Sequence, residues 1–564
     1  MKTIVLVDSS KVVQYKRVGK TILNCLEHFG IWHEIIDLNW AGISYEEIHN
    51  NVSVIILGQE GISSSISDTD FSLILKSVEN GTGLVIFDGY LNKYSEKFLK
   101  TIGIENFSSK KTQTVSLEKN WITEISPDVV YLKRDTLHYC PSVKSDWDIF
   151  MKNEQGNGCG FFRNYGKGKI VFWTTLPSIF LDEYLGHTEG LDGVFFRSII
   201  WASKKPFITK TMPPFVTGRI DDASGSGSPV SKYPETVNGL KYLDILNKYK
   251  FIPNIGLFID DLKEEDDKKI REKHYDGLAE FSPHAFSDPE NKNEFPIYLK
   301  HSGEEFSESE LKENFEKVDI KFGKIGINIS KTLNAHFGEV GLKTFPFLKE
   351  RGVKYFMNSI RVGKRWDDPL SKVWEVKPYS KPFFSLGYIP EDGYFFNVEA
   401  TPPKIDLSAS ALDSEKPDFD FLYGCTTFWD ENKKVEVEKA AKRGIFKIQR
   451  GLENGFFGCL TTHEQRISHI PILQFENIIS SISNEINKMS VIFKSYDFIS
   501  QYAESRANYT IDKIEITNKI SIVLKGENKV EQLLYLFTET NGLPKISFLK
   551  VPTFQKQIIL NFSI

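Results

Sequence analysis

The segment from Phe215 to Asp222 constrains the fold of this chain more than any other stretch. It runs through apolar and small residues, as a buried strand does, and ends in two adjacent carboxylates. The residues that follow, 223–229, are rich in glycine and serine and predict a flexible polar loop. A buried strand that stops at paired acids and opens into such a loop is typical of the C-terminal mouth of an α/β barrel, where barrel enzymes place their chemistry.

The two adjacent carboxylates, Asp221 and Asp222, leave two interpretations open. Successive side chains of an extended segment point in different directions, so one aspartate can face a metal while the other faces a water on that metal. The alternative is structural, because aspartates also cap loops and helix starts. The pair alone is compatible with both interpretations.

The composition is that of a soluble globular protein. The 564 residues include 40% hydrophobic and 26% charged side chains. The net charge is −5, and acidic and basic residues are interspersed, which argues against a nucleic-acid partner. A chain of this length predicts about three domains.

Several features bear on the cellular location. No run approaches the ~18 apolar residues of a transmembrane helix, and the apolar N-terminus is too short for a signal peptide. The five cysteines lack the spacing of metal ligands or of a disulfide framework, which indicates free thiols in a reducing compartment. The sequence therefore predicts a cytoplasmic protein and leaves a peripheral association with the inner membrane open.

Strand and helix patterns divide the chain into three predicted domains of an α/β protein. Residues 1–205 alternate short apolar strands with helical segments, which predicts a doubly wound parallel sheet. Residues 213–508 repeat strands and helices, with strands expected at 324–329 and 445–449 among others, and predict a distorted (β/α) barrel with C-terminal helices. Residues 509–564 carry short alternating strands and predict a small β-sandwich-like module.

A second candidate motif follows a later strand of the predicted barrel. His284 and Asp288 are four residues apart, so a single helical turn would place both on one face. Imidazole and carboxylate together suit Zn²⁺ or a similar divalent ion. The structural alternative is that Asp288 caps a helix and His284 is a hydrogen-bonded polar residue. The presence of Asp221 and Asp222 favours the metal.

Two more motifs follow in the same region. The glycine-containing loop Asn334–Glu339 includes His336 and leads into a predicted helix. Near the end of the predicted barrel, a strand delivers His463 to the same mouth. In their order and spacing, the four motifs resemble those of the polysaccharide deacetylase family, which has the NodB-type barrel and is carbohydrate esterase 4-like. The resemblance covers residues 213–489.

The resemblance implies a role for each matched residue. It makes Asp221 the general base and His463 the general acid. It makes Asp222, His284 and Asp288 the ligands of a divalent metal, with Zn²⁺ the expected ion. The family has a second histidine where this chain has Asp288. That departure leaves metal identity open.

The ligand set and the third motif both leave alternatives. His301 or His274 can replace Asp288 as a ligand from a nearby loop. The third motif of the family carries an arginine that orients the base, and this chain lacks it there. Arg219 or Arg361 is the expected substitute.

The remaining matched positions are assigned by the same resemblance. His336, Glu339 and Arg219 fall on the substrate or oxyanion side of the site. The acidic motif of the family is matched weakly around Asp420.

The first 205 residues resemble the glutamine-amidotransferase-like, flavodoxin-like domains found in sugar-active enzymes. The stretch 166–177 carries most of that likeness. In amidotransferases a cysteine sits on a tight turn after a strand, whereas the comparable strand here ends at Asp88. This difference predicts an accessory domain without glutaminase activity.

The function implied is a metal-dependent hydrolase that removes an N-acetyl group from an amino sugar in a polysaccharide, glycolipid or saccharide precursor. Its partner would be that N-acetylated saccharide. Two alternatives stay open: hydrolysis of another C–N amide bond, and a catalytically degenerate sugar-binding or scaffold protein. The sugar, the linkage and the oligomeric state are not determined by the sequence.

Overall fold

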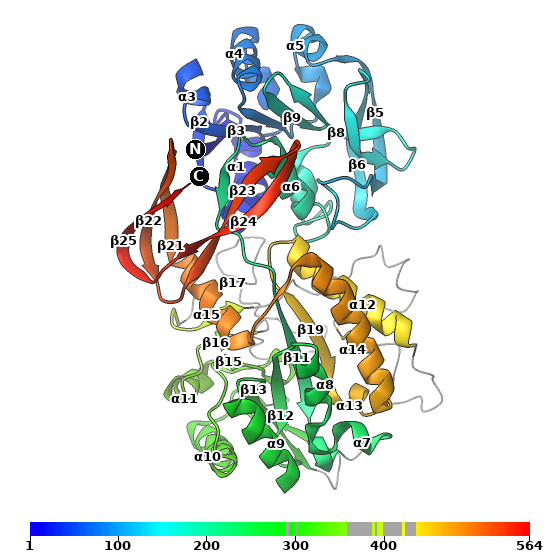
Figure 1. Ribbon diagram of the computed structural model, residues 1–564, viewed down its shortest axis with the longest axis vertical. Helices are drawn as coiled ribbons and strands as arrows, with labels where there is room; N and C mark the ends of the chain where they lie inside the picture. Colours follow the sequence, from blue (N-terminus) through cyan, green and yellow to red (C-terminus); the bar gives the residue numbers. More distant parts are fainter. Residues whose placement is uncertain are drawn as a thin grey trace.

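Two large sheets, one in each half of the chain, organise the molecule (Figure 1). The computed structural model describes residues 1–228, 231–288, 293–300, 302–357, 386–389, 392–398, 420–422 and 436–563. His301 and Arg361, both considered above, lie outside these ranges. No helix in the described part of the chain is both long and apolar enough to cross a membrane.

The N-terminal half is built on a nine-stranded sheet. In spatial order its strands are β2 (His33–Asp37), β1 (Lys2–Val7), β3 (Val52–Leu57), β4 (Gly83–Ile86), β9 (Gly168–Trp173), β8 (Gly158–Tyr165), β7 (Asp148–Asn153), β5 (Ile104–Leu117) and β6 (Val129–Val143). The first five pair in parallel, as the strand–helix alternation predicts. The other four pair in antiparallel fashion, an extension that the sequence analysis did not anticipate.

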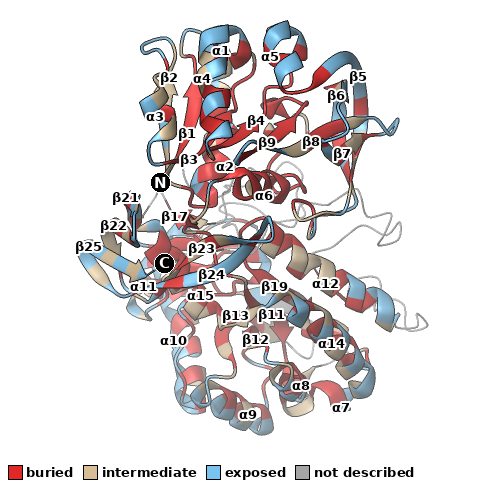
Figure 2. Ribbon diagram, turned by 45° about the horizontal axis from the view of Figure 1, so that its top comes forward, coloured by how far each residue is buried: buried red, intermediate tan, exposed pale blue. Residues whose placement is uncertain are grey.

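Helices cover the parallel part of this sheet. They include α1 (Val12–Lys20), α2 (Ile22–His28), α4 (Asp68–Glu79) and α6 (Asp192–Ala202). β3, β4 and β9 are buried along their whole length, which is why they are continuous apolar runs in the sequence (Figure 2).

The C-terminal half contains the strand that ends in the paired aspartates, β11 (Phe215–Ala223). All of β11 is buried inside a second sheet. The order of that sheet is β14 (Asn293–Pro296), β13 (Glu280–Asp288), β12 (Pro253–Phe258), β11 and β19 (Gly458–His463), with β20 (Ile492–Phe493) also paired to β11. β11, β12, β13 and β19 run in parallel, so their carboxyl ends lie at one edge.

A separate four-stranded sheet lies beside it. Its order is β15 (Thr332–Leu333), β16 (Tyr355–Phe356), β18 (Phe396–Val398) and β17 (Leu386–Tyr388). A hydrogen bond of 2.8 Å from the Ser330 amide to the Phe281 carbonyl links it to β13. In the described part of the chain, the strands of the predicted barrel therefore form two adjoining sheets and not one closed ring.

Two strands expected in this region are not formed. Residues 445–449 lie inside α12 (Val437–Glu453). The expected strand 324–329 begins in the last two residues of α10 (Glu308–Ile325) and continues outside any helix or strand. In α12 the buried positions Ala440, Gly444 and Ile448 repeat every four residues. This helical period outweighs the short apolar run that suggested a strand. The other helices around the second sheet are α8 (Tyr242–Lys248), α9 (Glu264–Tyr275), α14 (Ile472–Ile486) and α15 (Tyr496–Ala507).

The C-terminal residues form two three-stranded sheets. One contains β21 (Tyr509–Ile516), β22 (Lys519–Asn528) and β25 (Phe554–Ser563). The other contains β10 (Phe207–Thr209), β23 (Gln532–Thr540) and β24 (Leu543–Val551). Both sheets contribute to one apolar cluster. β10 comes from the segment between the two large sheets, so this connection is part of the C-terminal module.

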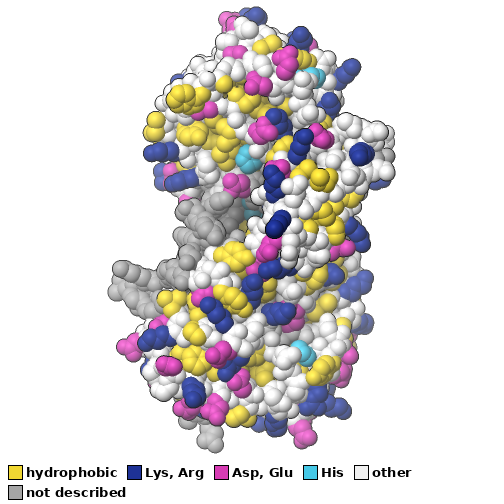
Figure 3. All heavy atoms as spheres, turned by 90° about the vertical axis from the view of Figure 1, so that its left-hand side faces the viewer, with side chains coloured by type: hydrophobic (Ala, Val, Ile, Leu, Met, Phe, Trp, Pro, Cys, Tyr) yellow, Lys and Arg dark blue, Asp and Glu magenta, His cyan; other side chains and the backbone are white. Residues whose placement is uncertain are grey.

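On the face drawn in Figure 3, basic, acidic and apolar side chains are interspersed. This arrangement agrees with the even distribution of charge along the sequence.

Two cations, the buried Arg506 and the half-buried Lys210, join the three parts of the chain. Arg506 donates to the backbone carbonyls of Lys210 and His28, and Nζ of Lys210 donates to the carbonyls of Arg506 and Tyr509 at 3.1 and 2.5 Å. The ring of His28 in turn contacts the carbonyl of Asn454 at 2.6 Å. Segments far apart in the sequence are thus held together at one point.

The buried ammonium group of Lys210 makes stability depend on pH. Burial, reinforced by the charge of Arg506, lowers its pKa from 10.5 to about 7. Between these pH values the unfolded chain binds more protons than the folded protein, so the free energy of unfolding rises with pH. We expect Lys210→Met to flatten the rise of the thermal midpoint across this window, and Lys312→Met, at an exposed position of α10, to leave it unchanged. Equal slopes in the Lys210→Met variant and the wild type would contradict this assignment.

Candidate metal centre

β11 ends in a bulge that separates the two aspartates. Its pairing with β12 shifts register between Ile220 and Ala223, and Asp222 adopts a left-handed conformation with φ of 55°. A bulge takes a side chain out of the regular alternation of a strand. Asp221 and Asp222 are both buried, and they reach different partners.

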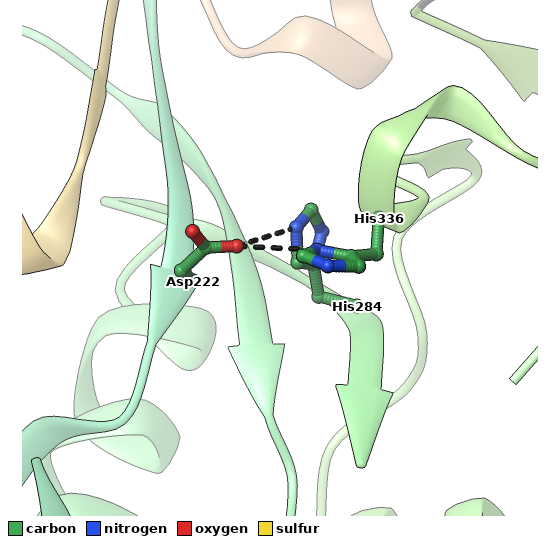
Figure 4. Close-up of side chains that lie close together, drawn as sticks. All are labelled: Asp222, His284 and His336. Atoms are coloured by element: carbon green, nitrogen blue, oxygen red, sulfur yellow. Dashed lines mark ion pairs between the residues drawn. The ribbon is translucent and has the colours of Figure 1, made fainter. Parts of the chain in front are cut away.

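The carboxylate of Asp222 meets two imidazoles (Figure 4). Its Oδ1 atom lies 3.0 Å from Nε2 of His284 on β13 and 3.3 Å from Nδ1 of His336, which begins the short helix η6 (His336–Gly338). One ligand atom from each residue lies within 4.8 Å of the other two, and all three residues are buried. The group can hold a metal ion.

Hydrogen bonding leaves a lone pair at the centre of this group. Nδ1 of His284 lies 2.7 Å from the backbone carbonyl oxygen of Asn334, which can only accept, so this nitrogen donates. In the neutral ring, Nε2 then carries a lone pair and faces the Asp222 carboxylate at 3.0 Å. Two acceptors at this distance repel each other unless a proton or a cation lies between them. A carboxylate with two imidazoles is a donor set for Zn²⁺ and similar ions, so the residues fit a metal.

The surroundings hold this geometry. A Cβ atom on Gly256 of β12 would lie 2.5 Å from Nδ1 of His284, so a side chain there would displace the ring. Burial raises the pKa of Asp222, but with a proton on Nε2 of His284 the hydrogen bonds that His284 and His336 donate, together with the charge of His463, outweigh burial and hold the pKa well below its usual range. The carboxylate is therefore ionised, as a metal ligand must be.

Asp221 is held by a bidentate ion pair. Arg219 donates from Nε to Oδ1 at 2.7 Å and from Nη2 to Oδ2 at 2.5 Å, and Nδ2 of Asn334 donates to Oδ1 at 2.7 Å. Burial raises the pKa of Asp221, but the charges of Arg219, His284 and His463 outweigh burial and lower it. Of the two arginines expected near the base, Arg219 makes this contact.

His463 lies opposite Asp221 where β19 pairs with β11. Its Nδ1 atom lies 2.7 Å from Oδ2 of Asp420, and its Nε2 atom lies 4.0 Å from Oδ2 of Asp222. Arg466 contacts the same Asp420 oxygen at 2.8 Å. Burial lowers the pKa of His463, but the hydrogen bond with Asp420 and the charge of Asp222 raise it to about 9. The ring is an imidazolium at neutral pH and can donate a proton.

The helical turn expected between His284 and Asp288 is absent, which is a correction to the sequence analysis. β13 stays extended to Asp288, whose backbone pairs with Asn293 of β14. The β13–β14 hairpin keeps this segment extended, and four residues of strand span about 13 Å. The spacing argument for Asp288 as a ligand alongside His284 therefore fails.

The other candidates lie apart from the group that Asp222 organises. His274 is in the last turn of α9, where its ring contacts Tyr275. Glu339 is buried three residues after His336. Neither belongs to the group of potential ligands found among the described residues.

His336 is the residue whose place sequence reasoning missed. It was expected on the substrate or oxyanion side, and the structure brings it to Asp222. Gly338, with φ of 67°, permits the tight turn in which His336 lies. A histidine before such a turn is a weak sequence signal, because its approach to Asp222 depends on where the four-stranded sheet that contains β15 lies.

No family model matches this sequence, and no curated protein matches it. Among solved structures, the chain is similar to a "putative polysaccharide deacetylase" from Mycobacterium smegmatis, with 14% identity, 53% of this chain and 92% of that chain covered, and a TM-score of 0.34.

It is also similar to the cytoplasmic protein STM3548 from Salmonella typhimurium, with 12% identity, 36% and 100% coverage and a TM-score of 0.28. The β-galactosidase from Bacillus circulans sp. alkalophilus has 10% identity, 37% and 33% coverage and a TM-score of 0.23. Because all three TM-scores lie below 0.5, the case for function rests on the side chains of the site.

Asp420 is expected to control the protonation of His463. Replacing it by asparagine removes a charge at hydrogen-bond distance, which should lower the pKa of His463 by about one to three pH units in the metal-free protein. NMR titration of the histidine ring measures this shift. The control Asp392→Asn removes a carboxylate that pairs with Lys349 and should leave the pKa of His463 unchanged. An unshifted His463 in the Asp420→Asn variant would refute the assignment.

Proposed function

We propose that this protein is a metal-dependent hydrolase that removes an N-acetyl group from an amino sugar. The observation that carries the proposal is the buried group of Asp222, His284 and His336, with an ionised Asp221 and a protonated His463 beside it. Acyl transfer from an amide needs a base, an acid and a site for developing negative charge. The substrate class comes from the resemblance of the motif order to the polysaccharide deacetylase family.

The ion would be held by Asp222, His284 and His336. A divalent cation there supplies Lewis-acid activation of a water and of the acyl carbonyl. Nδ1 of His284 donates to the Asn334 carbonyl, which fixes the tautomer and leaves Nε2 free to bind. His336, from another part of the fold, would thus supply the imidazole that the family has where this chain has Asp288.

Asp221 would act as the general base. The ion pair with Arg219 keeps its carboxylate ionised and fixes its direction, so it can take the proton of the attacking water. The oxygen of that water joins the acyl carbon, and the C–N bond then breaks. His463, oriented by Asp420, gives the departing amine its proton. The products are acetate and the free amino sugar.

The contacts of Arg219 and His336 argue against the interpretation of the chain as a catalytically degenerate protein. That interpretation depends on the arginine missing from the third motif and on Asp288 in place of a histidine. Arg219 contacts Asp221, and His336 contacts Asp222, so residues of the required types are present near the site. Hydrolysis of another C–N amide bond uses the same machinery, and a substrate screen separates it from deacetylation.

Metal analysis tests the ligand set. We expect about one equivalent of Zn²⁺ or another divalent ion in the purified or reloaded protein, and loss of that ion in Asp222→Ala and His336→Ala. Asp288→Ala is the matched comparison and should keep the ion, because β13 is extended between His284 and Asp288. Loss of metal in Asp288→Ala with retention in His336→Ala would reverse the proposed set.

Activity assays test the roles of the acid and the base. With N-acetylated chito-oligosaccharides as substrates and released acetate as the readout, Asp221→Asn and His463→Gln should each lower kcat by about 10²–10⁴-fold. Both variants should keep the metal, because neither residue is a proposed ligand.

Chelation should abolish the activity, and reloading should restore it. Metal-loaded wild-type protein that releases acetate at an unchanged rate after chelation would rule out the mechanism. Metal-loaded protein that binds these saccharides without turnover would favour the sugar-binding alternative.

A further inference from the structure

The loop after the paired aspartates is held by a buried carboxylate. Oε1 of Glu464 accepts hydrogen bonds from the backbone amides of Ser224 at 2.8 Å and Gly225 at 2.7 Å. Its Oε2 atom accepts one from the hydroxyl of Tyr242 at 2.8 Å. Glu464 itself is 1% exposed. The glycine- and serine-rich composition predicts a flexible loop, and the structure shows its first residues anchored.

A second carboxylate holds the next residues of the loop. Asp266 of α9 accepts from the Ser226 amide at 3.0 Å and from the Gly239 amide at 3.0 Å. A Cβ atom on Gly225, which has φ of 55°, would lie 2.6 Å from the Asp266 carboxylate. Gly225 therefore allows the close approach of the loop to the two carboxylates, and its conformation is set by them.

The loop held by Glu464 and Asp266 follows Asp222, a residue with a strained backbone. Asp222 has a φ of 55°, a conformation that is unfavourable for residues other than glycine and persists only where the surroundings enforce it. On one side of Asp222, β11 pairs with β12 and β19. On the other side, Ala223 pairs with Leu257 of β12, and the amides of the next two residues, Ser224 and Gly225, both bind Glu464.

We propose that Glu464 is a positioning residue for the metal centre. It follows His463 in the chain, and it binds the backbone two and three residues after Asp222. Glu464 thereby ties the strand end that carries the acid to the strand end that carries a metal ligand. The inference rests on the proposed metal site and adds a residue that neither contacts the ion nor matches a motif of the family.

Two variants separate the length of the side chain from its ionisable carboxyl group. Glu464→Asp keeps the carboxyl group but is one methylene shorter, so it cannot hold both amides. Glu464→Gln replaces the carboxyl group by an amide, which keeps an oxygen for both backbone amides while its NH₂ group donates to the Tyr242 hydroxyl. We expect the Kd for Zn²⁺ to rise about 10–100-fold in Glu464→Asp and to stay within about threefold of wild type in Glu464→Gln.

Glu280→Asp is the matched control. Glu280 is a half-buried glutamate that likewise binds the backbone, because it accepts a hydrogen bond from the Asp497 amide at 3.0 Å. Shortening it should lower the thermal midpoint without changing the Kd for Zn²⁺. The Co²⁺ absorption spectrum of each loaded protein gives a second readout, because altered coordination changes the ligand field. We expect an altered spectrum only in Glu464→Asp.

The outcomes distinguish this inference from the proposed function. Wild-type protein that binds neither Zn²⁺ nor Co²⁺ would overturn both. Wild-type binding together with an unchanged Kd and spectrum in folded Glu464→Asp would overturn the positioning role alone. Equal weakening in Glu464→Asp and Glu280→Asp would also overturn it, because a general loss of stability would then explain the result.

Discussion

Three side chains that can bind a cation, Asp222, His284 and His336, converge in the interior of the protein, and the structure around them keeps them together. A carboxylate oxygen and an imidazole lone pair 3.0 Å apart repel unless positive charge lies between them. The carbonyl of Asn334 sets the tautomer of one ring, and the bulge at the end of β11 aims the carboxylate. These local features suit a proton or a metal ion between the side chains.

Charge alternates through the rest of the site. Arg219 pairs with Asp221, and the buried carboxylate of Asp420 lies between Arg466 and His463. A buried carboxylate is stable as an ion only beside such partners. These ion pairs lower the pKa of Asp221 and raise that of His463. One side of the site therefore holds an ionised carboxylate and the other a protonated imidazole. The contacts that stabilise these buried charges would therefore also serve the proposed proton transfer.

The N-terminal sheet shows the contrast between a structural and a reactive carboxylate. Asp88 follows β4, at the strand end where the amidotransferase-like domains have a nucleophile. Its oxygens accept from the Gly61 amide at 2.9 Å, the Ser63 amide at 3.0 Å and the Ser63 hydroxyl at 2.8 Å. A carboxylate satisfied in this way organises a loop. This half of the chain contacts the C-terminal half through residues such as His28, whose ring lies 2.6 Å from the Asn454 carbonyl.

The sequence by itself determined the features that depend on local pattern. The apolar run of β11 ending in two acids, the parallel strands of the N-terminal half and the positions of Asp222, His284 and His463 at strand ends are all readable from short stretches. Tertiary structure decided the rest. Asp288 is separated from His284 because a β-hairpin extends β13. His336 reaches Asp222 because the four-stranded sheet that contains β15 lies beside the sheet that contains β11. The contact of His336 with Asp222 joins residues more than a hundred positions apart in sequence, and the extension of β13 depends on its pairing with β14. The four-residue spacing of His284 and Asp288 indicates neither.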